Sequence, residues 1–251
     1  MIQIQYGKIN GQIPSMWEEL TTEQLKIVFL AISSGNNKTA ISRCIYYIVP
    51  PDLRKCIANF TSEETLALQE SLSFLATPPK TSIWALPDYK IGGTLHNGPG
   101  NLLSSITIRE FGRAELYANK YATSENNDDL LKLACCLYRA LRNGKRRQYS
   151  DDMLRDTFKK FNELDKNTLE AILLNFACLR ESVYKKFDKA FPAVIDQENK
   201  KANLNKYGWE GNIQILSKYR HMNPEDYANR PLLEVFIELD QEAIILENQK
   251  S

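Results

Sequence analysis

Histidine is scarce in this sequence, which limits the metal chemistry that the chain can support. The two histidines, His96 and His221, do not lie at the spacing from a cysteine or a carboxylate that a zinc site requires. Of the five cysteines, Cys135 and Cys136 are adjacent, whereas a redox or zinc pair is separated by two residues. All five stand in apolar helical surroundings, which predicts small buried side chains. The sequence therefore predicts neither a metal site nor a cofactor.

Long apolar runs and an excess of charge of one sign are also absent. No stretch reaches the roughly eighteen apolar residues of a membrane span, and the opening MIQIQYGKINGQIP lacks the basic and apolar regions of a signal peptide. The 32 basic and 31 acidic residues leave a net charge of +1, so the whole chain is not expected to be drawn to nucleic acid or to anionic membranes. These features predict a cytoplasmic protein that does not contact membranes.

Signatures of catalysis are missing as well. The glycine-rich segment IGGTLHNGPGN lacks the Lys-Ser/Thr ending of a P-loop, and no parallel strand–helix–strand unit surrounds it. Acidic pairs such as those in SDD and NNDD stand at expected helix starts, where capping and the helix dipole account for them without acid catalysis. The sequence therefore predicts a protein that is not an enzyme.

Helical periodicity covers most of the chain. Leu25, Val28, Phe29 and Ile32 recur at the spacing of one helix face, and Thr21 or Thr22 is placed to cap that helix. Further helices are predicted over residues 38–49, 61–77, 107–121, 130–141, 150–161, 167–187, 209–220 and 231–247, with caps or capping boxes at Thr61 with Glu64, Thr107 with Glu110, and Ser150.

Strand signals are confined to the beginning of the chain. IQIQY, residues 2–6, alternates apolar and polar residues as a half-buried strand does, and Asn10-Gly11 is typical of a hairpin turn. The expected fold is mainly α, a bundle-like body of several helices with a short N-terminal β-hairpin or strand. We expect an N-terminal part over residues 1–76, an irregular linker over 77–105 that contains four prolines and four glycines (TPPKTSIWALPDYKIGGTLHNGPGNLLSS), and a helical body over 106–251.

The segment RALRNGKRRQ is the densest cluster of positive charge. It is expected at a helix end and in the loop after it, with Gly144 as the helix stop, and its cations are Arg139, Arg142, Lys145, Arg146 and Arg147. Arg142, Lys145, Arg146 and Arg147 are the candidates for contact with nucleic-acid phosphates. The alternative is that these cations complement the helix dipole. No helix-turn-helix pattern accompanies them, so nucleic acid is not the expected partner.

The last predicted helix, PLLEVFIELDQEAIILENQ, has an apolar face wider than one packing seam needs. Phe236 and Leu239 are expected to pack into the body. The candidates for contact with a partner protein are the acidic residues Glu238 and Glu242 and the apolar Ile244 and Ile245, because an acidic rim would favour a basic helical partner.

Two stretches resemble a known family. IPSMWEELTTEQLKIV resembles the opening of proteins from tail modules of tailed bacteriophages and prophages, and YGWEGNIQILSKYR, followed by an acidic helix, looks like the tryptophan helix of the same proteins. These are tail assembly chaperones, which are encoded beside the tape measure protein and bind it before the tail tube polymerises. The positions that match, expected to serve folding, are Ile13, Pro14, Trp17, Leu20, Thr21, Gln24, Gly208 and Trp209.

The resemblance implies a tail assembly protein in the host cell cytoplasm whose partner is the tape measure protein, with no catalytic residue. The chain is long for that family, which leaves open a structural virion component such as a connector or adaptor. A third alternative is a nucleic-acid-binding regulator that uses Arg139 to Arg147. Self-association into a homo-oligomer is open in each case.

Overall fold

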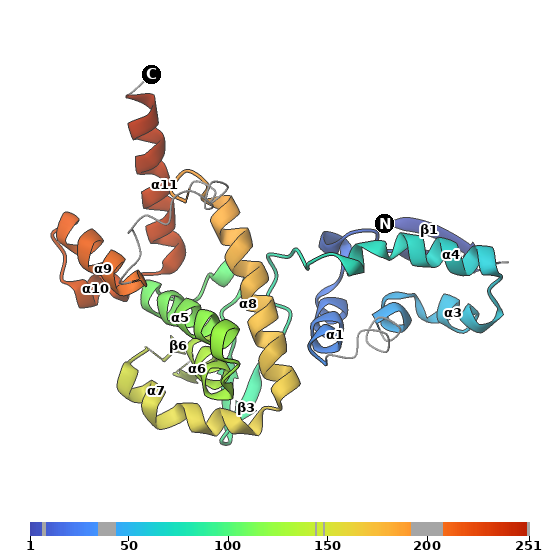
Figure 1. Ribbon diagram of the computed structural model, residues 1–251, viewed down its shortest axis with the longest axis horizontal. Helices are drawn as coiled ribbons and strands as arrows, with labels where there is room; N and C mark the ends of the chain where they lie inside the picture. Colours follow the sequence, from blue (N-terminus) through green and yellow to red (C-terminus); the bar gives the residue numbers. More distant parts are fainter. Residues whose placement is uncertain (7–8, 35–43, 144, 148, 192–207, 250–251) are drawn as a thin grey trace.

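The computed structural model describes residues 1–6, 9–34, 44–143, 145–147, 149–191 and 208–249. Over these residues the protein is mainly helical, with two small antiparallel sheets, so the expected fold class is confirmed. Figure 1 shows an N-terminal part that contains α1, α3 and α4, and a body built from α5 to α11. Helix α1 (Thr22–Ser33) packs against α8 (Lys166–Lys186), which joins the two parts.

A hairpin opens the chain, as expected, but its turn lies elsewhere. Strands β1 (Ile2–Tyr6) and β2 (Ile9–Ile13) pair antiparallel, with Tyr6 opposite Ile9. The turn predicted at Asn10-Gly11 is therefore wrong, because both residues lie within β2. Gly11 serves packing: a Cβ atom there would lie 2.3 Å from Cδ1 of Leu53 in α3 (Pro51–Arg54), so a larger residue would require the buried side chain of Leu53 to shift.

The N-terminal helices begin where their caps were predicted. Thr21 and Gln24 form a capping box on α1, and Thr61 and Glu64 form one on α4 (Ser62–Ser71). Helical structure is present at residues 44–48, whereas residues 38–43 of the helix expected over 38–49 lie outside the described part of the chain. Short 3-10 turns complete this part at Trp17–Glu19, Ile57–Asn59 and Ser73–Ala76.

The body begins at α5, which Thr107 and Glu110 cap as predicted, and Ser150 caps α7 as predicted. Its other helices pack around α5 and α8 (Figure 1). The bounds are α5 (Ile108–Ser124), α6 (Asn127–Leu137), α7 (Asp151–Thr157), the 3-10 segment η5 (Phe158–Glu163), α9 (Gly208–Tyr219), α10 (Pro224–Ala228) and α11 (Leu232–Asn248).

A second sheet, in the order β3-β4-β5-β6, was not predicted. Its strands are β3 (Tyr89–Ile91), β4 (Thr94–Asn97), β5 (Arg139–Arg142) and β6 (Lys145–Arg146). The helix expected over 130–141 ends at Leu137, because Tyr138 turns into extended backbone and its hydroxyl donates to the carbonyl of Pro87 at 3.0 Å. The expected helix end therefore becomes a strand that pairs with β4.

The segment over residues 77–105 contains β3 and β4 and is fastened to the body. Asn175 of α8, which is fully buried, donates from Nδ2 to the carbonyl of Ile83 and accepts the backbone N–H of Ala85. The indole of Trp84 packs against Tyr138 and donates to its hydroxyl at 3.3 Å. The prolines and glycines thus shape a hairpin and its approaches along α8.

Trp209 belongs to an aromatic cluster that joins α5, α8, α9 and α11. Its ring lies 5.4 Å from that of Phe111 and 5.6 Å from that of Phe236, and its indole N–H donates to Glu115. A Cβ atom on Gly112 would stand 2.5 Å from the Cβ of Trp209, so α5 and α9 approach each other where α5 has no side chain. Trp209 is therefore part of the architecture.

Replacing Gly112 by alanine is expected to destabilise the protein, although alanine favours a helix by about 1 kcal/mol over glycine. The new methyl group would lie 2.5 Å from Cβ and 3.0 Å from Cγ of Trp209 on α9, and overpacking of this kind costs about 1–3 kcal/mol. Denaturant unfolding followed by circular dichroism measures the difference. Asn119→Ala, at an exposed position of the same helix, is the control and is expected to be neutral or stabilising. Equal effects of the two substitutions would contradict the close contact.

Candidate functional site

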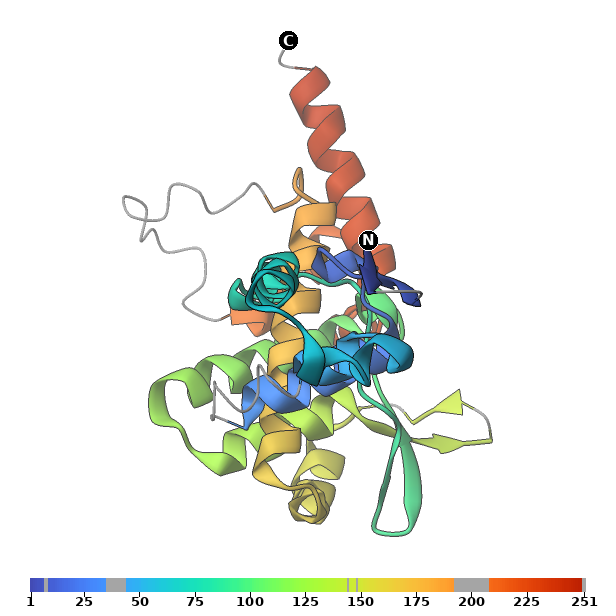
Figure 2. The same ribbon diagram turned by 90° about the vertical axis from the view of Figure 1, so that its right-hand side faces the viewer.

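Helix α11 is embedded in the body at its first turns and projects from it in its C-terminal half, where polar contacts with the body remain. Its first turns bury Leu232, Val235 and Phe236 completely. Beyond them the helix extends away from the other helices, and both views show its C-terminal half standing clear (Figures 1 and 2). The apolar side chains of this half are exposed: Ile244 by 40%, Ile245 by 55% and Leu246 by 55%.

The exposed apolar side chains of α11 form two groups. Ile237 and Ile244 are seven residues apart, about two helical turns, so they share one side of the helix, and Ile245 adjoins them. Ile237 is itself 45% exposed and lies on the side opposite Val235 and the partly buried Leu239. Leu246 prolongs the buried stripe past the end of the body. We call Ile237, Ile244, Ile245 and Leu246 the apolar tip.

The acidic residues of α11 face arginines of the same chain. Glu238 accepts from the guanidinium of Arg230, which holds the pKa of that carboxyl below its usual range, and Arg220 lies within ion-pair distance of it. Glu242 pairs with Arg220. The expected partner-binding residues therefore divide: Ile244 and Ile245 are exposed, whereas Glu238 and Glu242 are partly covered and engaged in internal ion pairs.

Further contacts hold the middle and the C-terminal end of α11. The carboxylate of Asp240 accepts the backbone N–H groups of Lys189 and Ala190, at 3.1 and 3.0 Å, and Lys189 pairs with Glu247. Sequence reasoning missed Arg220, Arg230 and Lys189, because each lies on another element and no spacing along α11 indicates it. The acidic rim is thus largely matched by these cations.

The basic segment over residues 139–147 is a β-hairpin, so its predicted place at a helix end is wrong. Arg139 is 1% exposed; its Nε donates to Oε1 of Glu110 at 2.9 Å and its Nη1 to the carbonyl of Cys135. Arg146 donates to the carbonyls of Gly98 and Leu137, at 2.8 and 2.7 Å. Two cations of the cluster therefore fasten the hairpin to the body.

The remaining three cations of the cluster are Arg142, Lys145 and Arg147. Arg142 and Lys145 are paired on the two strands, and only their backbones are described. Arg147 is exposed, and its backbone N–H donates to the carbonyl of Ala140 at 3.0 Å. The structure thus does not bring the four predicted nucleic-acid residues together on one exposed face, because Arg146 is turned inward. Burial and the nearby Arg139 lower the pKa of Arg146 to about 10.

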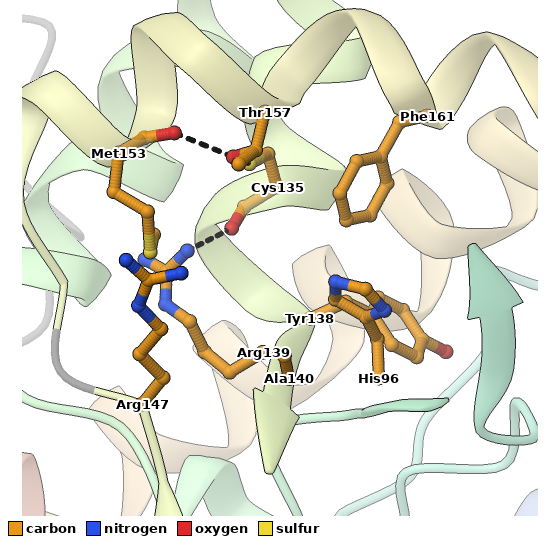
Figure 3. A pocket seen from close by; sticks show the side chains of 9 residues that line it. All are labelled: His96, Cys135, Tyr138, Arg139, Ala140, Arg147, Met153, Thr157 and Phe161. Atoms are coloured by element: carbon orange, nitrogen blue, oxygen red, sulfur yellow. Dashed lines mark hydrogen bonds between the residues drawn. The ribbon is translucent and has the colours of Figure 1, made fainter. Parts of the chain in front are cut away.

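A small cavity lies between β5, α6 and the α7–η5 segment (Figure 3). Its volume is about 30 Å³, and it is partly open to solvent. The residues that line it are His96, Cys135, Tyr138, Arg139, Ala140, Arg147, Met153, Thr157 and Phe161.

His96 and Cys135 of this cavity do not form a nucleophile–base pair. Nδ1 of His96 lies 2.8 Å from the carbonyl of Thr94, and burial lowers the pKa of the imidazole. Sγ of Cys135 lies 3.4 Å from Oγ1 of Thr157, and burial raises the pKa of the thiol. Each group therefore has its own neighbour and its neutral form is favoured, which suits packing rather than nucleophilic catalysis.

A wider surface hollow of about 310 Å³ lies beside α5 and α7. Of the basic residues that line it, Arg113 pairs with Asp151 and Glu210, and Arg155 pairs with Asp152. Lys132 lies over the rings of Tyr117 and Phe158, at 5.8 and 5.6 Å. These contacts indicate that the residues of the hollow serve packing between the helices.

Across the described ranges, no group of three or more His, Cys, Asp and Glu side chains is arranged to hold a metal ion. In the same part of the chain, no helix combines the length and the apolarity that crossing a bilayer takes. Comparison with protein-family models, curated proteins and solved structures finds no match for this chain.

Proposed function

We propose that this chain is a tail assembly protein of a tailed bacteriophage or prophage, acting as a chaperone of another tail protein in the host cell cytoplasm. The observation that carries the proposal is the apolar tip, where four large aliphatic side chains stand exposed on a projecting helix. Exposed apolar groups such as Ile237, Ile244 and Ile245, which lie on neighbouring sides of this helix, are typical of protein-binding surfaces. The resemblance of the first and last segments to tail assembly chaperones supplies the partner, the tape measure protein.

The shape of the tip favours a helical partner. Ile237 and Ile244 lie about two helical turns apart on one side of α11. An amphipathic helix that packs along α11 could therefore bury both together with Ile245. Because Arg220, Arg230 and Lys189 already match the acids of α11, the contact would be mainly apolar. The proposed role requires no chemistry at the interface, only binding that covers an apolar segment of the partner before it assembles.

Two other functions are alternatives to this proposal. A connector or adaptor of the virion would use the same tip against a neighbouring subunit, and it would be present in stoichiometric amounts in purified particles. The nucleic-acid-binding regulator has less support, because Arg139 and Arg146 donate to groups of their own chain. A tape measure gene beside the gene for this chain would favour the chaperone.

The double substitution Ile244→Ser with Ile245→Ser is expected to weaken binding of the adjacently encoded tape measure protein by about tenfold or more, since each isoleucine would lose its apolar contact. Co-purification and titration of the two proteins measure the effect. Leu66→Ser is the matched control: Leu66 lies on α4, away from α11, and is 55% exposed, as is Ile245.

The outcomes separate the alternatives. Both variants should keep the circular dichroism of the parent, because all three positions are on the surface. If the double variant binds the partner as tightly as the parent does, α11 is not part of the interface. If the parent forms a dimer that the double variant loses, as light scattering would show, the tip joins copies of this chain instead.

A further inference from the structure

We infer that the cavity of Figure 3 binds a small oxyanion, of which inorganic phosphate is the representative, between the guanidinium groups of Arg139 and Arg147. The inference is independent of the apolar tip, which lies on α11. It rests on the charge balance, on a buried donor without an acceptor, and on the residues that line the cavity.

Positive charge exceeds negative charge around the cavity. Two arginines, Arg139 and Arg147, line it, and the carboxylate of Glu110 lies 2.9 Å from Arg139 and 3.7 Å from Arg146, which is not part of the lining. Arg147 makes no ion pair with any residue that the structure describes. Glu110 is therefore shared by two arginines and does not pair with Arg147, so an anion beside Arg139 and Arg147 would meet uncompensated charge.

One hydrogen-bond donor of Arg139 has no acceptor among the described residues. Its Nε and Nη1 are engaged by Glu110 and the carbonyl of Cys135, whereas Nη2 is buried and has no partner among the described residues. The ring of Tyr149 lies 4.7 Å from the guanidinium carbon and holds the group in place. A buried guanidinium donor normally has an acceptor. Because Arg139 lines the cavity, we expect a ligand bound there to accept a hydrogen bond from its Nη2.

The lining favours an anion. Arg139 and Arg147 both contribute to it, and Figure 3 shows their guanidinium groups at the same end of the cavity, beside Met153. None of the described residues that line the cavity is acidic. Lys160, whose charge acts on His96 nearby, adds to the positive field.

The geometry of the donors favours an oxyanion over a lone halide. A guanidinium group presents parallel N–H donors that match two oxygens of a phosphate, whereas a single atom can meet only one such direction well. The cavity of about 30 Å³ has room for only about two groups of the size of water, and it is partly open, so the ligand would direct two oxygens to the arginines and keep the others in water. Arg139 would fix the site from within, and the exposed Arg147 would complete it at the rim.

The test is calorimetric titration of the full chain with inorganic phosphate at low, constant ionic strength. We expect saturable one-site binding that Arg147→Gln weakens by about tenfold and that Arg147→Lys retains in part, because lysine keeps the charge and loses the fork. Arg155→Gln is the matched control: Arg155 is an exposed arginine of α7, paired with Asp152, that does not line this cavity.

Arg139 is part of the fold, so the test avoids substituting it. Thermal unfolding provides a second readout: phosphate should raise the Tm of the parent and of Arg155→Gln more than that of Arg147→Gln, with chloride at equal ionic strength as the reference. Absence of saturable binding, equal affinity of Arg147→Gln and the parent, or equal stabilisation by chloride would each overturn the proposal. Binding of an oligonucleotide but not of free phosphate would overturn it as well.

Discussion

Glu110→Gln is expected to lower the free energy of unfolding by about 3–5 kcal/mol, the range found when one partner of a buried ion pair loses its charge. Glu110 is 3% exposed and Arg139, whose Nε it accepts, is 1% exposed. Glutamine keeps the size of the side chain and its place in the capping box with Thr107. The loss would therefore come from leaving the buried guanidinium of Arg139 and the partly buried one of Arg146 without their carboxylate.

Urea unfolding of the parent and the variant measures this difference. Glu64→Gln is the matched control, because Glu64 occupies the same position in the capping box of Thr61, on α4, where the contact is exposed to solvent. Its cost is expected to stay within about 0.5 kcal/mol. If the two substitutions cost the same, the carboxylate of Glu110 serves only as a cap and the buried ion pair contributes nothing of its own.

The features that could be predicted from the sequence are local ones. Thr21, Thr61, Thr107 and Ser150 each cap a helix whose free amides lie within three residues, so the spacing in the sequence is also the spacing in space. The helical class followed from periodicity in the same way. These features need no knowledge of distant contacts.

The second sheet depends on distant contacts, and the sequence pattern misleads there. Leu137 and Leu141 are four residues apart, as on one helix face, yet the helix ends at Leu137. What ends it is the side chain of Tyr138, which packs on Trp84 and bonds to Pro87, and the pairing of β5 with β4. No feature of residues 130–141 alone indicates these partners.

The candidate site was predictable in part. The apolar stripe of α11 runs without a break from Leu232 to Leu246, so periodicity gives its width but not the point at which the body stops covering it. In the structure, the body covers the helix only up to a point before Ile244. The acids of the same helix were expected to face a partner, but Arg220 and Arg230 come from other elements and engage them.

Phe236→Ala is expected to lower the free energy of unfolding by about 3–5 kcal/mol, because it removes a large buried ring and leaves a cavity. Phe236 is fully buried at the base of α11. Its ring lies 4.6 Å from that of Phe191, 5.6 Å from that of Trp209 and 5.7 Å from that of Phe111. These rings come from separate elements, so no single neighbour can close the gap.

Ile237→Ala is the control, since Ile237 is the next residue on the same helix and is 45% exposed. Its cost should be well below that of Phe236→Ala, while its effect on partner binding should be the larger of the two once the proteins are compared in their folded states. Urea unfolding followed by circular dichroism gives the first comparison and titration with the partner gives the second. A small cost for Phe236→Ala would mean that α11 is not anchored by the aromatic cluster. The projecting tip would then lose the rigid base that lets it present Ile237 and Ile244 on one side.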